Sequence, residues 1–592
     1  MDKSKITKSL AVFASVLLII IIGVASFAYF GTFNVNLNNN VAVNINSSSP
    51  GNATFTSTAT QLNLQVPAAN MSFTVANNTV AAKEDTAFLD VTLTGSQNLL
   101  TTCTYDIVYE YDAGSNVYGQ GTTTKTSGAT KEITIEVNGM NGNNHFATET
   151  NFDHANIQSY YDSTNKYYKL VEGATIKSLG STQSVRWKII GRYYNLDVSQ
   201  AQLGGKNFTG KIYAISKGCS SEDGSSVKKG YETILANNGG AASMTTLTST
   251  DFAKVTTASD KGMYKAQDDL GTSYYFRGAV DNNWVKYGKY TKDTYYTYDG
   301  DYNYSLVSSC DGLDNCFKIA SKGDDMYWRI IRINGDNSIR MIYAGTYAPD
   351  SNTKVVMQSY DENDNFLRFT SAGYSKFNKN YNSAEYVGYM YTIGEQHGTS
   401  QSSDIKTYLE DWYANYTDLN ATGTKITDQI YCNDRTASTS SSGATGEISS
   451  WTSTGTAYYY GAGNRILGAG SSPTPTLICA NANDKFSTTT TKGNGKLSYP
   501  VGLITADEVN MAGADNQYNS NSSYYLYTYD WYWAGSPYGF GGGDAREFGV
   551  FDGGSLGWSY VYGDVVVRGV VSLSSESKLL GSGTYNDVYV VS

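Results

Sequence analysis

The chain has 592 residues, with 43 Lys and Arg against 54 Asp and Glu, and a formal net charge of −11. This charge opposes binding to nucleic acid or to an anionic membrane surface. Charged residues make up only 16% of the chain, whereas it contains 51 Tyr and 59 Gly, a mixture typical of half-exposed β-strands and polar loops. The sequence therefore predicts a mainly β protein with an α+β part in its C-terminal half.

Residues 1–30 predict a signal peptide or a membrane anchor. Three lysines precede an uncharged segment at residues 9–30, close to the roughly 20 apolar residues that a helix needs to cross a bilayer. The positive-inside rule then places the rest of the chain outside the cell. The product is either a single-pass protein on the extracellular face of the membrane or, after cleavage near Ser26 and Ala28, a secreted protein.

Composition divides the chain that follows. Residues 31–52 are rich in Asn, Val and Ser and predict a spacer. Residues 53–225 predict a β-sandwich domain, because short alternating runs such as 132–137 and 184–194 are separated by Gly, Asn and Ser. Residues 226–260 are rich in Gly, Ser and Thr and predict a linker.

Residues 261–592 form the second predicted domain. The runs 328–333 and 338–343 are joined by Asn, Gly and Asp residues that tolerate positive φ, which predicts a β-hairpin. Residues 404–416 have apolar side chains at helical spacing, and Asp404 stands where a helix cap is expected.

The six cysteines predict disulfides, since their number is even and the chain is exported. None lies in a CxxC motif, which argues against a zinc site. Pairing within each predicted domain favours the bridges Cys103–Cys219, Cys310–Cys316 and Cys432–Cys479.

A set of short motifs in the C-terminal half occurs in a fixed order: residues 262–264, 273–278, 328–340, 411–413, 432–435, 503–509, 533–537 and 567–573. Together they resemble a C-terminal domain of surface proteins from gut Firmicutes and their wall-less relatives. The resemblance implies a C-type-lectin-like fold in the branch near formylglycine-generating enzymes. Gly569 replaces the proline usual in that family, and residues 289–327 are an expected insertion.

A shorter resemblance concerns the N-terminal half. The segment at residues 193–208, with Tyr193, Tyr194 and Phe208, is similar to exported camelysin-like sandwich proteins, as is the junction at residues 28–30. Those proteins form fibres or lie on Gram-positive surfaces, which implies a structural alternative for this chain.

Catalytic residues are hard to find in this sequence. His145, His154 and His397 are scattered without metal-ligand spacing. Formylglycine-generating relatives depend on active-site cysteines, for which Cys432 and Cys479 are the candidates, but we expect these two to form a structural disulfide. We therefore do not expect an enzyme, and an extracellular enzyme of that type is the least favoured alternative.

Calcium is the one cofactor that the sequence leaves open. Residues 361–365 (DENDN) offer several hard oxygen ligands close together. The segment lacks the Gly and the distal Glu of an EF-hand loop, so a solvated turn is the first interpretation and no cofactor is expected.

Residues 531–568 carry the candidate binding site, because aromatic and charged side chains alternate there with Gly and Ser, the composition of many protein-binding surfaces. The same rings would stack on sugars, and in the alternative interpretation they form the core of the domain. The candidate residues are Tyr538, Phe540, Asp544, Arg546, Glu547, Phe551, Trp558, Tyr560 and Tyr562.

These observations predict a cell-surface binding protein, an adhesin or lectin-like receptor, with the sandwich as stalk and the C-terminal domain as head. The expected partner is a glycan or a protein of a host or neighbouring cell. The alternative is a structural, fibre-forming surface protein. Arg568 lies in an apolar run, so we expect its charge to be paired or bonded to carbonyl groups and to hold the fold.

Overall fold

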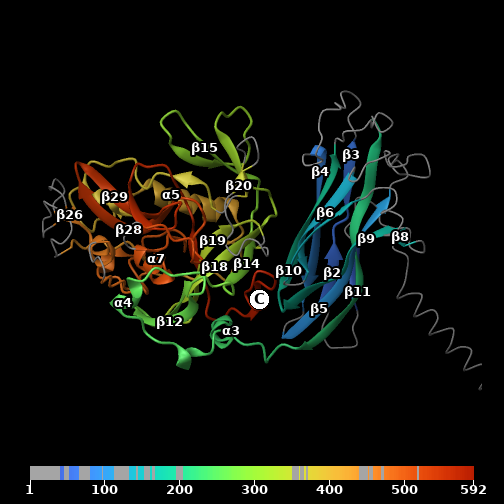
Figure 1. The fold of residues 1–592 in the computed structure, drawn as a ribbon, viewed down its shortest axis with the longest axis horizontal. Helices are drawn as coiled ribbons and strands as arrows, with labels where there is room; N and C mark the ends of the chain where they lie inside the picture. The colour runs from blue at the N-terminus through green and yellow to red at the C-terminus, as the bar shows by residue number, and fades with distance from the viewer. Residues whose placement is uncertain are drawn as a thin grey trace, which may run out of the picture.

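The computed structural model shows two β-rich units lying side by side (Figure 1): a sandwich domain with strands β1–β11, and a head that follows it. The predicted signal or anchor at residues 1–30 lies outside the described residues. Among the helices that are described, none is long and apolar enough to cross a membrane. The structure describes residues 41–45, 53–65, 81–95, 98–111, 133–141, 144–151, 161–162, 167–194, 205–347, 349, 359–360, 366–368, 371–438, 451, 458–467, 472–515 and 519–592.

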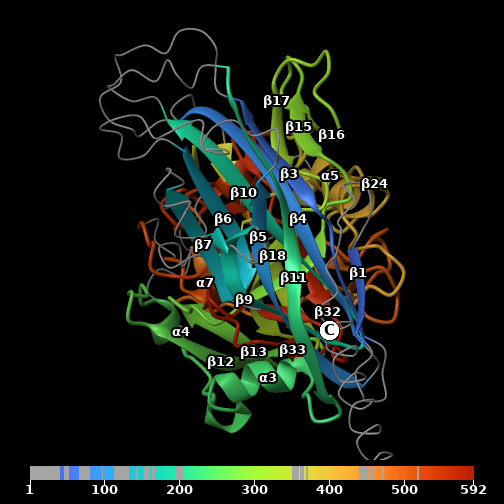
Figure 2. The same ribbon diagram turned by 90° about the vertical axis from the view of Figure 1, so that its right-hand side faces the viewer.

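The sandwich domain consists of two packed sheets (Figure 2). The first has the order β1 (Val41–Ile45), β2 (Ala53–Ser57), β4 (Ala81–Thr94), β10 (Thr182–Tyr194), β6 (Ile133–Asn141), β7 (Asn144–Asn151). The second has the order β3 (Thr60–Gln65), β11 (Asn207–Asp223), β5 (Leu99–Tyr111), β9 (Tyr167–Leu179), β8 (Tyr161–Asp162). Strand β1 adds part of the predicted spacer to the first sheet, where it pairs with β2.

Alternation along each strand builds the core between the two sheets. Val185, Trp187 and Ile189 on β10 are buried, as the period of two in a strand requires. The indole N–H of Trp187 donates to the Tyr105 hydroxyl of the facing sheet at 3.0 Å, so the buried polar group of each ring is satisfied.

All three predicted disulfides are confirmed. Cys103–Cys219 links β5 to β11 at positions that pair directly across the two strands. Cys310–Cys316 closes a short loop, and Cys432–Cys479 joins the end of the short strand β25 (Tyr431–Cys432) to a loop of the head. No cysteine of the described chain is free.

The head is built on a central eight-stranded sheet. Its hairpin β18–β19 confirms the prediction for residues 328–343, with Ile333 opposite Ile339 and a positive φ of 67° at Asn337 in the turn. The sheet has the order β12 (Lys261–Asp268), β13 (Gly271–Gly278), β18 (Asp325–Ile333), β14 (Trp284–Lys289), β34 (Tyr589–Val591), β33 (Leu579–Leu580), and β19 (Ile339–Gly345) pairs with β18 and with β32 (Val570–Leu573).

A second, six-stranded sheet and several short elements complete the head. The sheet comprises β22 (Tyr374–Ser375), β31 (Val565–Val566), β28 (Tyr532–Gly541), β29 (Asp544–Val550), β30 (Leu556–Tyr560) and β26 (Tyr458–Tyr459). The short elements are β20 (Ser359–Tyr360), β21 (Phe366–Arg368), β23 (Met390–Tyr391), β24 (Gln401–Ser402), β25 (Tyr431–Cys432), β27 (Lys485–Phe486), η2 (Ala241–Ser243), η3 (Ala384–Val387), η5 (Ala482–Asp484), α6 (Gly461–Ile466) and α7 (Ala506–Ala512).

The segment predicted as a linker carries two helices, α3 (Gly230–Asn237) and α4 (Ser249–Phe252). Ile234 of α3 is fully buried in the core of the head, and the amide of Gly230 donates to the carbonyl of Ser577 at 2.7 Å. This segment is therefore packed as part of the head. Its Gly, Ser and Thr content marks tight turns between the short helices, such as Gly239 and Gly240 with φ of 86° and 82°.

The predicted helix at residues 404–416 is α5 (Asp404–Asp411), continued by a π-helical turn, η4 (Trp412–Tyr416). Its cap is Ser403 and not Asp404, because the Ser403 side chain accepts from the Lys406 amide at 3.4 Å. The carboxylate of Asp404 accepts instead from the Lys379 amide at 2.6 Å and so ties the first turn to the preceding loop.

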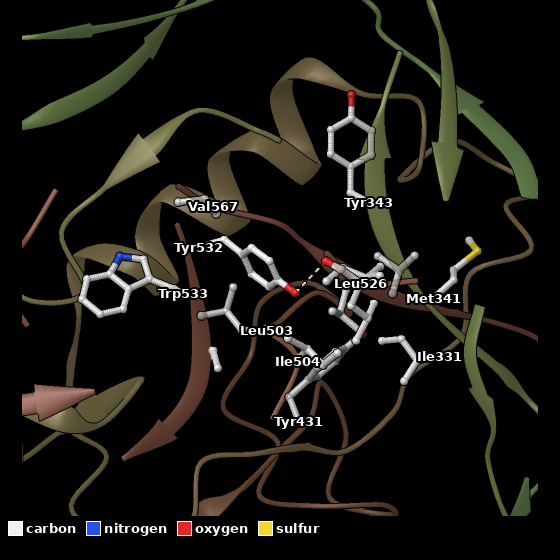
Figure 3. Close-up of a cluster of buried hydrophobic side chains, with 14 of the residues drawn as sticks. Ile331, Met341, Tyr343, Tyr431, Leu503, Ile504, Leu526, Tyr532, Trp533 and Val567 are labelled. Atoms are coloured by element: carbon white, nitrogen blue, oxygen red, sulfur yellow. Dashed lines mark hydrogen bonds between the residues drawn. The ribbon is translucent and has the colours of Figure 1, made fainter. Parts of the chain in front are cut away.

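The core between the two sheets of the head is rich in aromatic rings (Figure 3). The Tyr532 hydroxyl donates to the Leu526 carbonyl at 3.0 Å, the bond drawn in Figure 3. Arg568 is fully buried here and donates to the carbonyls of Tyr343 and Leu526 at 3.0 and 3.2 Å. Its predicted carbonyl bonding is confirmed.

The predicted insertion folds into a small sheet with the order β16 (Tyr304–Val307), β15 (Thr294–Tyr298), β17 (Cys316–Ala320). It projects from the head at the top of Figure 1. The Cys310–Cys316 disulfide joins the loop after β16 to the start of β17.

The sandwich and the head share a packed interface (Figures 1 and 2). Trp284 and Tyr327 of the head are buried in one hydrophobic cluster with the core of the sandwich. Lys286 donates its Nζ proton to the Ser184 carbonyl at 3.0 Å. Gln183 Nε2 donates to the carbonyl of Val591 at 2.8 Å. The two units are thus joined by apolar and polar contacts.

Candidate ligand-binding surface

The candidate binding residues lie on the sheet that contains β28, β29 and β30. Strands β28 and β29 form a hairpin in which Gly541 pairs with Asp544. Its two-residue turn is Gly542-Gly543, with φ of 67° and 91°, a conformation that glycine adopts without steric cost. On the other side of β29, Arg546 lies opposite Tyr560 and Phe548 lies opposite Trp558 on β30.

Six aromatic rings follow one another across this region, and we call them the aromatic row. Successive ring centroids are 4.8 to 5.6 Å apart, and two of the contacts are parallel stacks, with interplanar angles of 11° for Tyr538–Trp558 and 8° for Tyr560–Tyr562. Such pairs are rigid and add to the stability that burial provides. The row is, in order, Tyr459, Tyr538, Trp558, Tyr560, Tyr562 and Tyr381.

Arg546 contributes a positive charge at the centre of the row. The carbon of its guanidinium lies 4.3 Å from the centroid of the Trp558 ring and 5.6 Å from that of Tyr560. This is the geometry of a cation–π contact. Nη2 also donates to the carbonyl of Gly541 at 3.1 Å, so the guanidinium is held from two sides.

Exposure rises along the row from Tyr538 onward. Tyr459 is half-buried and Tyr538 is 6% exposed, whereas Trp558 and Tyr560 are half-buried and Tyr562 and Tyr381 are 37% and 44% exposed. Partial desolvation, followed by the negative charge of Asp544, raises the pKa of Tyr562. The row is therefore anchored by the buried ring of Tyr538 and has an open end at Tyr562 and Tyr381 that solvent reaches.

The structure does not bring all the predicted residues to this surface. Phe540 is 6% exposed and belongs to the core of the head. Phe551 contacts the Trp531 ring, with centroids 4.8 Å apart, and lies outside the row. Asp544 is half-buried on the same strand as Arg546, and no salt bridge joins the two among the described atoms.

Glu547 is the least expected of these residues. Its side chain is fully buried, and neither carboxyl oxygen has a hydrogen-bond partner among the described residues. Burial raises the pKa of Glu547 well above its ordinary value, although the charge of Arg435 opposes this. Alternation along β29 turns Glu547 to the face opposite Arg546, so Glu547 is an interior group and not part of the surface that carries Arg546.

Tyr381 and Tyr459 were not among the predicted residues. They lie far upstream of the candidate segment, and Tyr occurs throughout this chain. Nothing in the local sequence distinguishes these two from the other tyrosines. Only the packing of the chain brings them to the two ends of the row.

The residues considered for catalysis are held in structural contacts. Cys432 and Cys479 are joined in a disulfide. Nδ1 of His397 lies 2.9 Å from Oδ2 of Asp484, which also bonds Arg435. The side chains of His145 and His154, and the candidate calcium segment 361–365, lie outside what the structure describes. Within the described residues, no cluster of three or more His, Cys, Asp or Glu side chains could hold a metal.

A polar cleft near the Cys432–Cys479 disulfide is the other candidate site. Its acidic and basic side chains bind one another: Arg332 to Asp268 and Glu508, and Arg465 to Asp434 and Asp507, at 2.6 to 3.0 Å. Because these charged groups already bind one another, they are less available to a ligand than the groups of the aromatic row are.

Comparison with protein families and with curated proteins adds no relative: no family model matches the chain, and no curated protein matches its sequence.

Proposed function

We propose that the chain is a cell-surface binding protein whose head recognises a partner through the aromatic row and Arg546. The observation that carries this proposal is the row itself, in which stacked rings and a guanidinium emerge from a buried anchor to a solvent-exposed end. Tyr, Trp and Arg are the residues that contribute most to binding at interfaces. Rings held by stacking also lose little side-chain entropy when a partner binds.

The arrangement of the two units agrees with this role. The sheet with β26, β28 and β29 lies on the side of the head farthest from the sandwich (Figure 1). If the N-terminal segment anchors the chain in a membrane, the sandwich connects this anchor to the head. The row then lies on the side of the head that faces away from the sandwich. We retain the C-type-lectin-like assignment of the head as part of this proposal, on the motif resemblance alone.

The test is binding of the purified full-length chain to arrays of glycans and of extracellular proteins, with and without calcium. A variant with Tyr381→Ser, Tyr560→Ser and Tyr562→Ser removes the accessible part of the row and leaves its buried anchor intact. Tyr529→Ser is the matched control, because Tyr529 is 60% exposed and lies outside the row.

We expect specific binding that the triple variant loses by at least ~10-fold and that the control retains. Equal binding by the triple variant and the original chain would place the site elsewhere, for which the projecting insertion at residues 289–327 is the next candidate. Absence of binding on both arrays would contradict the proposal and favour the structural, fibre-forming alternative.

A further inference from the structure

Arg546 differs from the other arginines of the head whose side chains are described. Arg332, Arg340, Arg435 and Arg465 form salt bridges with carboxylates at 2.6 to 3.0 Å. Arg277, Arg329 and Arg568 are buried and donate to backbone carbonyls. Arg546 is half-buried, has no carboxylate within salt-bridge distance among the described residues, and donates a hydrogen bond to the carbonyl of Gly541 at 3.1 Å.

The aromatic contacts leave this charge available at the surface. A guanidinium has five N–H donors in a planar fork that fits a carboxylate. Stacking on Trp558 and Tyr560 holds the fork in place but provides no negative charge. Arg546 is therefore a pre-oriented cation without an electrostatic partner among the described residues of its own chain.

The rings on either side favour one class of partner. Trp558 stacks on Tyr538 and contacts Arg546, and Tyr560 stacks on Tyr562 and contacts the same guanidinium. Because each of these two rings has a stacked neighbour and a guanidinium against it, less of its face is open to a ligand than on an isolated ring. A sugar stacks flat on an uncovered ring face. Side chains of a protein can instead pack between ring edges, as they do at protein interfaces.

We propose that the partner is a protein that places an Asp or Glu carboxylate against Arg546, with apolar side chains between the rings of the row. This inference rests on the proposed function and adds to it the class of partner and the charge that the partner carries. The carboxylate forms a bidentate, charge-assisted pair with the guanidinium, which is stronger than a pair between neutral groups.

The negative charge of Asp544, near the row, provides a second test of the proposal. Asp544 lies two residues before Arg546 on β29 and is close enough to Tyr562 to raise its pKa. A negative charge at this position repels an acidic partner. Removing it should strengthen binding, whereas removing Arg546 should weaken it.

The probe is a phage-displayed library of disulfide-constrained random peptides, selected on the full-length chain. We expect the selected peptides to be enriched in Asp and Glu relative to the starting library. Arg546→Met, which keeps an unbranched side chain against the rings, should weaken their binding by at least ~10-fold. Asp544→Asn should strengthen it by about threefold, and Tyr529→Ser should leave it unchanged. Arg546→Lys keeps the charge without the planar fork and should weaken binding less than Arg546→Met.

Binding to panels of acidic and neutral glycans, measured in parallel, distinguishes failure of this inference from failure of the proposed function. The inference would be overturned if the selected peptides were not enriched in Asp and Glu. It would also be overturned if Arg546→Met bound them as tightly as the original chain does. Acidic glycans that bind in an Arg546-dependent way, with no peptide selected, would also overturn it but leave the proposed function intact. If no probe of either class depends on the row, both proposals fail. Thermal unfolding of each variant shows whether it is folded. If Arg546→Met is not folded, Arg546→Lys is the variant that tests the inference.

Discussion

The guanidinium of Arg546 lies 4.3 Å from the centroid of the Trp558 ring, so this indole is the ring nearest to the charge at the centre of the aromatic row. Trp558 also stacks on Tyr538 at 5.4 Å. Trp558→Ala removes both contacts, and we expect it to lower the free energy of unfolding by about 2 kcal/mol. Urea denaturation followed by circular dichroism measures this loss. Tyr529→Ala is the control, and an equal loss in both variants would show that the row adds no stability.

The Glu508 carboxylate should make the head sensitive to acid. Its Oε1 lies 2.8 Å from Nε of Arg332 and 2.7 Å from Nε of Arg340. Desolvation by burial alone would raise its pKa, but the charges of these two arginines outweigh it and lower the pKa of Glu508 from 4.5 to about 2. Because the folded-state pKa is lowered, this charge stabilises the head fully above pH 4.5, and the contribution is lost as the pH falls toward 2.

We therefore expect Glu508→Gln to lower the free energy of unfolding at pH 7 by about 3 kcal/mol, because two buried arginines lose a counter-charge. The variant should also lose stability less steeply between pH 4.5 and 2 than the original chain does. Urea denaturation at a series of pH values measures both effects. Parallel pH profiles for the two proteins would contradict the assignment.

Ionisation of Asp530 should make the free energy of unfolding depend on pH in the opposite direction. Burial raises the pKa of Asp530 from 3.8 to about 7, although a hydrogen bond from the Trp531 amide opposes this. Its Oδ2 has no hydrogen-bond partner among the described residues. Between these two pKa values the unfolded chain ionises at Asp530 while the folded chain stays protonated, so stability falls as the pH rises through this window.

Asp530→Asn should remove this loss, since an amide does not ionise and its oxygen can still accept from the Trp531 amide. We expect the variant to be more stable than the original chain at pH 8 by up to about 4 kcal/mol, and close to it at pH 4. Thermal unfolding at the two pH values measures the difference. A stability gain of the same size at both would mean that ionisation is not its cause.

Local sequence patterns predicted the elements that depend on few residues. The hairpin of β18 and β19 could be found because its alternation and its turn residues are contiguous. The cap of α5 was misplaced by one residue, since Ser403 and Asp404 are both residues that commonly cap a helix. The three disulfides were paired correctly because each joins cysteines of one structural unit.

The candidate site was only partly predictable, for two physical reasons. Arg546, Trp558 and Tyr560 lie in one segment, but Tyr381 and Tyr459 reach the row through packing of distant parts of the chain. Composition also does not say which face of a strand points inward, and a shift of one residue exchanges the two faces. Glu547 thus read as a ligand contact, whereas it is buried in the head. In the predicted linker, a short helix at residues 231–236 could be predicted and corresponds to α3, whereas α4 and the packing of the segment against the head were hidden by its Gly, Ser and Thr content.

The disulfides should differ in their effect on stability. Cys103 and Cys219 are separated by 116 residues in the sequence, whereas Cys310 and Cys316 are separated by 6. A disulfide that closes a longer loop restricts the unfolded chain more. Replacing both cysteines by Ala should therefore cost about 5 kcal/mol for the first bridge and about 2 kcal/mol for the second. Chemical denaturation of the two double variants tests the order, and a larger loss for the short loop would contradict it.

Trp284 should couple the unfolding of the two units. It is 1% exposed and lies in one hydrophobic cluster with buried residues of the sandwich. Since a large apolar contact links the units, we expect the original chain to unfold in a single calorimetric transition. Trp284→Ala removes this contact at a cost of about 3 kcal/mol and should separate the transition into two.

Trp412→Ala is the matched control for this experiment. Trp412 is also a fully buried tryptophan, but it packs within the core of the head. Its loss should lower the melting temperature without dividing the transition, because the contact between the units is kept. Two transitions in the original chain, or one in Trp284→Ala, would show that the units unfold independently of this contact. Coupled unfolding would mean that the head and the sandwich act as one rigid support for the aromatic row.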